Sequence, residues 1–286
     1  MQEVRKGLIM EGGAMRGMFT SGVIDVFMEN GVDFDGAVGI SAGAAFGCNI
    51  KSKQIGRAIR YNKRFCKDPR YAGFRSLIKT GDLYGADFCY RAIPDELDIF
   101  DRNTFKSNPM HFYVGALNCE TGKTIYHDCT DGEEIDIQWI RASASMPLVS
   151  RIVEVDGYKL LDGGMCDSIP YEFLENEGYD RNVVILTQPK GYVKKSNKLA
   201  PLAKVMIHDY PNVAKAMKER HIRYNEQTRL VEQREAEGKA YVIRPETSLD
   251  IGKMEKDPVE LERVYQLGRM QGINHLERIK KFLEIE

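Results

Sequence analysis

The chain has 286 residues, enough to bury one large core or two modest ones. Hydrophobic residues make up 43% and charged residues 29%, as in ordinary globular proteins. Lysine and arginine total 41 against 42 aspartate and glutamate residues, so the charge balance excludes a strongly basic, nucleic-acid-binding class.

The cysteines and the apolar runs indicate the compartment. Six scattered cysteines form no C-x-x-C pair, which favours reduced thiols over disulfides and predicts no metal site. The apolar run Leu8-Ile9-Met10 is short and ends at Glu11, so it is no secretory signal. No stretch approaches the roughly 20 apolar residues of a membrane span. We therefore expect a cytoplasmic protein, and peripheral contact with a membrane surface stays an open alternative.

Short apolar runs alternate with helical patterns along the chain, which is typical of an α/β architecture. The predicted strands are Val4–Met10, Gly36–Ile40, His111–Asn118, Thr124–His127, Tyr158–Leu161, Val183–Thr187 and Ala240–Arg244. Runs that are apolar on both faces predict a mainly parallel sheet with helices on each side. The helical pattern Met18–Asn30 joins the first two strands, so the chain is expected to begin with a right-handed βαβ unit.

Three further regions have helical patterns. Residues 54–110 combine helices with irregular segments, and residues 198–237 are interpreted as two helices separated by Pro211. The amphipathic stretch Val259–Leu283 is expected to be interrupted near Gly272. We see no internal repeat or low-complexity tract, so one domain is predicted. Its expected parts are a catalytic core over about 5–190, a helical segment 198–237 and a strand–helix part 240–286, within the whole range 1–286.

The motif Gly39-Ile40-Ser41-Ala42-Gly43 follows an apolar strand and precedes a run of small residues. A nucleophile elbow turns sharply from strand to helix there and needs small residues beside its serine. A helix that begins at Ala42 would aim free N–H groups at the serine oxygen. We therefore interpret Ser41 as a nucleophile, with Gly39 and Gly43 as its supports.

The turn Glu11–Gly17 also lies between a strand and a helix. Its glycines allow close approach of the backbone, which suits a phosphate cradle or an oxyanion hole. A dinucleotide site requires a third glycine where Ala14 stands, and an acid where the second strand instead leads to Ser41. The N–H groups of Gly12, Gly13 and Ala14 are therefore the predicted oxyanion hole.

A third motif, Asp162-Gly163-Gly164, follows the predicted hairpin Ile152–Leu161 with its turn at Asp156-Gly157. An aspartate at a strand end, with two glycines clearing space, can reach a serine on a nearby strand. D-G-G alone is a common turn, so the motif gains its meaning from the other two.

No histidine stands on a strand-end loop where a triad would need it; the five are His111, His127, His208, His221 and His275. This favours a two-residue site in which Asp162 accepts the proton of Ser41. Asp167 is the nearest competing acid, and we expect it to cap the segment that starts at Ser168-Ile169-Pro170.

The three motifs, in this order, resemble those of the patatin-like phospholipases, and most closely a bacterial branch of that family. The resemblance includes Arg16-Gly17 of the glycine turn and Ala142-Ser143-x-x-x-Pro147 before the aspartate. It implies a three-layer αβα sandwich and hydrolysis of acyl esters in lipids, without a metal or cofactor. It also implies a Ser41–Asp162 dyad. Ala14 replaces a glycine that many members have, so its Cβ is expected to narrow the acyl site.

Two other functions remain as alternatives. One is a lipid- or acyl-binding protein that keeps the fold with little turnover, and the other is a nucleotide-binding enzyme that uses Gly12–Gly17. Residues 54–110 and 198–237 are expected to shape the acyl pocket or a lipid-facing surface, or else to pack on the sheet.

Overall fold

A mixed sheet of eight strands forms the centre of the computed structural model, which describes residues 4–197, 202 and 205–285. The order is β5-β6-β3-β2-β1-β7-β8, with β4 paired to β3. The strands are β1 Lys6–Met10, β2 Gly36–Ile40, β3 His111–Asn118, β4 Thr124–Cys129, β5 Val153–Val155, β6 Tyr158–Asp162, β7 Arg181–Ile185 and β8 Ala240–Ile243. All seven strands predicted from the sequence are present, within a few residues of their predicted ends.

The sheet is mostly parallel. Strands β3, β2, β1, β7 and β8 pair in parallel, whereas β4, β6 and β5 add antiparallel pairs at one side. The predicted hairpin is confirmed, because β5 and β6 pair through a turn in which Asp156 and Gly157 both have positive φ. β1 and β2 run side by side in parallel, so the glycine turn and the elbow leave the same edge of the sheet.

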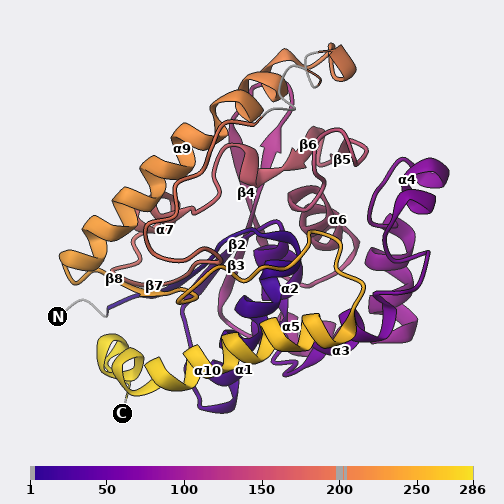
Figure 1. Cartoon of the computed structure of the whole chain (residues 1–286). Coiled ribbons are helices and arrows are strands. Elements are labelled where there is room, and N and C mark those ends of the chain that lie inside the picture. Colours follow the sequence, from indigo (N-terminus) through magenta and orange to yellow (C-terminus); the bar gives the residue numbers. More distant parts are fainter. Residues whose placement is uncertain (1–3, 198–201, 203–204, 286) are drawn as a thin grey trace.

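Helices cover both faces of the sheet, which gives the expected three layers (Figure 1). The helices are α1 Gly17–Glu29, α2 Ala42–Lys51, α3 Arg57–Phe65, α4 Phe74–Thr80, a π-helix Phe88–Leu97, α5 Arg102–Ser107, α6 Glu134–Ser143, α7 Tyr171–Asn176, α9 Pro211–Ala236 and α10 Pro258–Leu283. In β1, Leu8 and Met10 join the core beneath α1, α2 and α10, whereas Ile9 joins the core beneath α7 and α9. This alternation is the two-residue period of a strand buried on both sides.

The structure tests the helices predicted for residues 198–237 and 259–283. α9 begins at Pro211 and continues to Ala236, as predicted for the second helix of that region. The first helix predicted there falls partly on residues outside the described part of the chain. The interruption predicted near Gly272 is wrong, because α10 continues through it to Leu283. Gly272 lies against Val26 of α1, where a Cβ would come within 3.0 Å of the valine, so the glycine serves packing.

Helices α1 and α10 cross at very short range. A Cβ on Gly268 of α10 would lie 2.0 Å from the carbonyl oxygen of Phe19, and one on Gly22 would lie 2.1 Å from that of Tyr265. Glycine at both positions lets the two backbones touch, and this contact fastens the C-terminal helix beside the first βαβ unit. None of the described helices is long and apolar enough to cross a membrane.

We predict that Gly268→Ala lowers the free energy of unfolding by about 1–3 kcal/mol, because the added methyl group forces the two helices apart. Gly252→Ala is the matched control, since the nearest atom to its new Cβ is a Glu255 oxygen at 3.8 Å. The control should change stability by less than about 0.5 kcal/mol in urea denaturation. Equal stability of the two variants would contradict the proposed helix contact.

Candidate active site

The Ser41 side chain stands on a strained turn between β2 and α2. Its backbone has φ 55° and ψ −118°, a conformation that a residue with a side chain rarely adopts. A Cβ on Gly39 would lie 2.4 Å from the carbonyl oxygen of Gly43, and one on Gly43 would lie 2.2 Å from that of Met10. Both flanking glycines are therefore required sterically, because strand, turn and helix pass within contact distance of one another.

The glycine turn lies directly against this serine. A Cβ on Gly12 would come within 2.9 Å of the Ser41 Cβ, so only glycine fits there. Among the described residues, the N–H groups of Gly12, Gly13 and Ala14 have no hydrogen-bond acceptor. Ala14 has φ 49°, which explains why glycine is favoured at this position. These unpaired N–H groups beside Ser41 are available to a ligand.

Two neighbouring residues support this turn. Arg16 donates through Nε to Thr187 Oγ1 at 3.2 Å, so it anchors the turn to the segment after β7. A Cβ on Gly17 would lie 2.7 Å from the ring of Phe46 in α2, so Gly17 lets α1 start close to α2.

Asp162 ends β6 and accepts a hydrogen bond from the Ser41 hydroxyl, with 2.8 Å between Ser41 Oγ and Asp162 Oδ2. Its other oxygen accepts the N–H of Gly164 at 2.8 Å. The carboxylate is only 3% exposed, and burial raises its pKa. A Cβ on Gly163 would lie 2.3 Å from the carbonyl oxygen of Gly115, so this glycine lets the turn fit over β3.

A nearby guanidinium limits the rise in the pKa of Asp162. Arg220 of α9 donates from Nε to the carbonyl oxygen of Gly164 at 2.6 Å. Its charge lowers the pKa of Asp162, as do the bonds from Ser41 and Gly164 and the charge of Lys253. The sequence motifs did not indicate Arg220, because it lies on a long helix more than fifty residues after the aspartate.

Two more residues that carry no catalytic signature hold the site together. Ser143, at the end of α6, accepts the N–H of Ser41 at 2.9 Å and donates to the carbonyl oxygen of Gly115 at 2.7 Å. Glu11 is buried and accepts bonds from Thr187 and from the Tyr224 hydroxyl, the latter at 2.8 Å. Ser143 and Glu11 both stand within sequence motifs, the run Ala142–Pro147 and the turn Glu11–Gly17, but neither motif indicates these contacts.

None of the five histidines contacts Ser41 or Asp162. They bond instead to Asp128, Asp136, Asp209, Lys218 and Tyr241, in the order His111, His127, His208, His221 and His275. Asp167 does not cap α7, which has no side-chain cap, but the backbone N–H of Ile169 in the segment before α7 bonds to its carboxylate. Asp167 accepts from Tyr126 and Gln227, and burial raises its pKa to about 6.

His127, Cys129 and Asp136 bring potential metal ligands within 4.8 Å of one another. Asp136, however, accepts the N–H groups of Asp131 and Gly132 and bonds to His127 at 2.8 Å. Its oxygens therefore fasten the loop before α6. The arrangement has the contacts of a structural network rather than those of a ligand set.

An apolar pocket with a volume of about 100 Å³ opens beside Ser41. Ala14, Met15 and Phe46 form the wall next to the serine, and α6 adds two isoleucines. Much of the remaining wall comes from residues 57–100, so this region shapes a cavity as well as packing on the sheet. Such a cavity suits an acyl chain.

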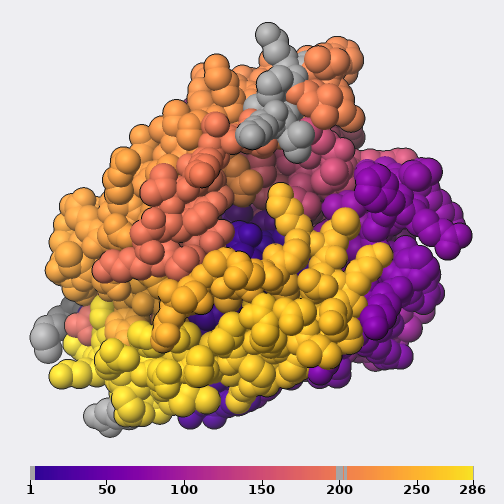
Figure 2. Space-filling view, viewed as in Figure 1, coloured from indigo at the N-terminus to yellow at the C-terminus, as the bar shows by residue number. Residues whose placement is uncertain are grey.

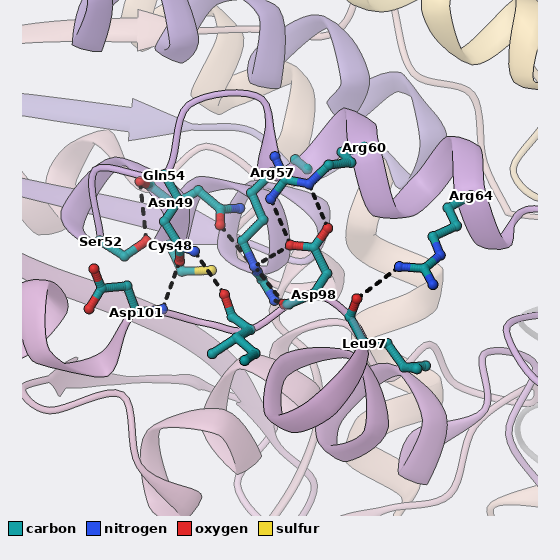
Figure 3. A network of polar contacts seen from close by, with 12 residues as sticks. Cys48, Asn49, Ser52, Gln54, Arg57, Arg60, Arg64, Leu97, Asp98 and Asp101 are labelled. Atoms are coloured by element: carbon teal, nitrogen blue, oxygen red, sulfur yellow. Dashed lines mark hydrogen bonds and ion pairs between the residues drawn. The ribbon is translucent and has the colours of Figure 1, made fainter.

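Arg57 belongs to the pocket wall, although it is charged. Its guanidinium donates to the carbonyl oxygen of Asp98 at 2.7 and 3.1 Å and to Asn49 at 3.2 Å (Figure 3). Arg60 binds the Asp98 carboxylate through two bonds of 2.7 Å. These bonds fix the buried charge as part of the wall, so the space beside Ser41 remains apolar.

We predict that Ser143→Ala lowers the free energy of unfolding by about 1–3 kcal/mol, because it leaves the Ser41 N–H without its acceptor. Ser145→Ala is the control: that hydroxyl donates only within its own helix end, to Arg141. Urea denaturation of both variants checks this. A loss for Ser145→Ala as large as for Ser143→Ala would contradict a special role for Ser143.

Two family profiles match the chain. The patatin-like phospholipase profile matches residues 8–174, and a family described as a domain of unknown function (DUF6363) matches residues 210–284. The first range contains the elbow, the glycine turn and the D-G-G motif. The second contains α9, β8 and α10, and therefore Arg220.

Individual proteins also match the chain. The chain is 33% identical to the uncharacterized protein YjjU of Escherichia coli, over 66% of this chain and 53% of that protein. It is 24% identical to lysophospholipase nte1 of Aspergillus niger, over 96% of this chain and 18% of that protein. The chain thus spans about half of one curated relative and a small part of the other. The solved structure of VipD from Legionella pneumophila aligns with TM-score 0.48 and 13% identity, over 96% of this chain and 67% of that one.

Proposed function

The chain belongs to the patatin-like phospholipase family, and from this premise we propose that it hydrolyses acyl esters of lipids with Ser41 as nucleophile and Asp162 as general base. One observation carries the proposal: the serine hydroxyl on a strained elbow donates to a buried carboxylate at 2.8 Å. That distance lies within the range needed for proton transfer. The name of the fungal relative, lysophospholipase, agrees with a lipid ester as substrate.

The proposed reaction begins when Asp162 accepts the proton of the Ser41 hydroxyl as its oxygen attacks the ester carbonyl. Burial raises the pKa of Asp162, which makes the carboxylate a stronger base than an exposed one. The negative charge that develops on the carbonyl oxygen is placed at the N–H groups of Gly12, Gly13 and Ala14. Asp162 then gives the proton to the leaving alcohol, and an acyl group remains on Ser41.

Water then hydrolyses the acyl-enzyme, and Asp162 again acts as the base. Asp162 accepts a proton from the water, which attacks the acyl-enzyme, and Ser41 recovers its proton as the fatty acid leaves. The apolar pocket beside Ser41 would hold the acyl chain during both steps. Ala14 lines that pocket, so its methyl group would narrow the site where the chain enters.

We predict that Ser41→Ala abolishes both ester hydrolysis and labelling by a fluorophosphonate. Asp162→Asn should lower kcat by several orders of magnitude, about as severely as Ser41→Ala, because the two groups act as a unit. Asp167→Asn is the control, since its carboxyl bonds to Tyr126 and Gln227 instead. Labelling that persists in Ser41→Ala would end the proposal.

The same assay tests the absence of histidine from the reaction. Single replacements of the five histidines should each leave most activity intact. If one of them silences a folded enzyme, a triad would replace the proposed dyad.

We predict that Arg220→Met moves the acid limb of the pH–kcat/KM profile toward higher pH. Asp162 must be ionised to accept a proton, so activity falls as the pH drops through its pKa. Arg220 lowers that pKa, and its removal therefore raises it. Arg223→Met is the matched control, because that guanidinium pairs with Glu219 and donates to Cys166. An unshifted limb in Arg220→Met would contradict the electrostatic role.

A further inference from the structure

Lys194 is held in a fixed place beside the candidate active site. Its N–H donates to Asn225 Oδ1 at 2.9 Å, and its carbonyl oxygen accepts from Asn225 Nδ2 at 3.1 Å. These two bonds tie the segment after β7 to α9. The ammonium group lies 4.1 Å from the centre of the Tyr224 ring and 5.6 Å from that of Tyr192. The side chain is therefore positioned, partly buried and oriented by aromatic rings.

The ammonium of Lys194 has no carboxylate partner among the residues that the structure describes. The carboxylate that acts most strongly on it is Glu11, whose oxygens already accept bonds from Tyr224 and Thr187. Arg220, one helical turn before Tyr224, adds a second cation nearby, although part of its charge already compensates Asp162. A partly buried cation such as Lys194, which has no ion pair of its own within the described part of the chain, is stabilised when an anion binds beside it.

Some of the same charged residues influence the pKa of both Lys194 and Asp162. Burial lowers the pKa of Lys194 to about 8, and the cations Arg220, Arg16 and Lys253 act in the same direction. Two of them, Arg220 and Lys253, also act on Asp162. Arg220 and Lys253 therefore lie close enough to influence both Lys194 and Asp162.

The surface leaves this place open. Figure 2 shows a hollow between the segment that follows β7 and the segment that follows β8, with N-terminal residues in indigo at its floor. Lys194 belongs to the first segment and Lys253 to the second. The acyl pocket is lined by other residues, among them Phe46 of α2, Tyr61 of α3 and Ile140 of α6, and neither lysine belongs to its wall.

We propose that Lys194 and Arg220 form a subsite for the phosphate group of the substrate's head group, beside the ester that Ser41 attacks. This inference rests on the proposed function. A phosphate offers oxygen acceptors and negative charge to both cations, and Arg220 can turn its unused guanidinium N–H groups toward it. The subsite would select esters whose alcohol part carries a phosphate over neutral glycerol esters with the same acyl chain.

The test compares two soluble substrates with one short acyl chain, a monoacylglycerol and the corresponding monoacylglycerol phosphate. We expect wild type to prefer the phosphate ester in kcat/KM, and Lys194→Met to lower that preference about tenfold or more, chiefly through KM. Lys195→Met is the matched control, because it removes the same charge from an exposed neighbour and should keep the wild-type preference. Lys194→Arg should retain most of the preference, which separates a loss of charge from a loss of folding.

The pH dependence gives an independent readout. Lys194 loses its proton as the pH rises through about 8, so the preference of wild type should fall there. A phosphate monoester is already doubly charged in this range, since its second pKa is about 6. Lys194→Arg should remove this pH dependence because arginine stays protonated.

The outcomes separate the two proposals. If neither ester is hydrolysed, the proposed function fails. If both are hydrolysed at equal efficiency, or if Lys194→Met slows both equally, the phosphate subsite is overturned. Glycerol 3-phosphate, added as an inhibitor, distinguishes a site for a lipid head group from a site for a free phosphate. If it inhibits monoacylglycerol hydrolysis while the enzyme shows no preference between the two esters, the site binds a free anion. That result would overturn the head-group subsite.

Discussion

The contact between the glycine turn and the elbow is the constraint on which the site depends. Gly12 allows the Ser41 Cβ to approach the first turn, and Gly43 lets α2 start against the end of β1. Because no side chain separates these segments, Ser41 is held in a conformation that it would otherwise avoid. The strain is sustained by a parallel pair of buried strands, β1 and β2, and it leaves the serine hydroxyl pointing at Asp162.

Charge compensation is the second constraint. A buried aspartate tends to be neutral, and a neutral Asp162 would be no base. Arg220 opposes that tendency from α9, and it also holds the carbonyl oxygen of Gly164 in the same turn. The region that matches the profile of a domain of unknown function therefore supplies part of the electrostatic environment of the site. α10 of the same region packs on α1 through Gly22 and Gly268, which links it to the half of the chain that contains Ser41 and Asp162.

The sequence was sufficient for the parts of the molecule whose signals are local. Strands buried on both faces give unbroken apolar runs, and an elbow or a D-G-G turn needs glycine within a few residues of its acid or serine. Arg220 and Tyr224 could not be found in this way, because they lie on a distant helix, α9, that folds over the site. The same limit explains the error at Gly272. In sequence, a glycine that interrupts a helix looks the same as a glycine that lets a neighbouring helix approach. Only the folded chain shows that Gly272 packs against Val26 and therefore belongs to the second kind.

The proposed phosphate subsite and the proposed base depend on the same charge. With the site empty, Arg220 and Lys253 oppose the rise in the pKa of Asp162 that burial causes. An anion bound between Lys194 and Arg220 would screen part of that positive charge, and the pKa of Asp162 would rise. The carboxylate would then become a stronger base at the moment when an ester lies beside Ser41. Binding of a phosphate head group would thus increase the basicity of Asp162. A neutral ester would neither contact Lys194 and Arg220 nor raise the pKa of Asp162.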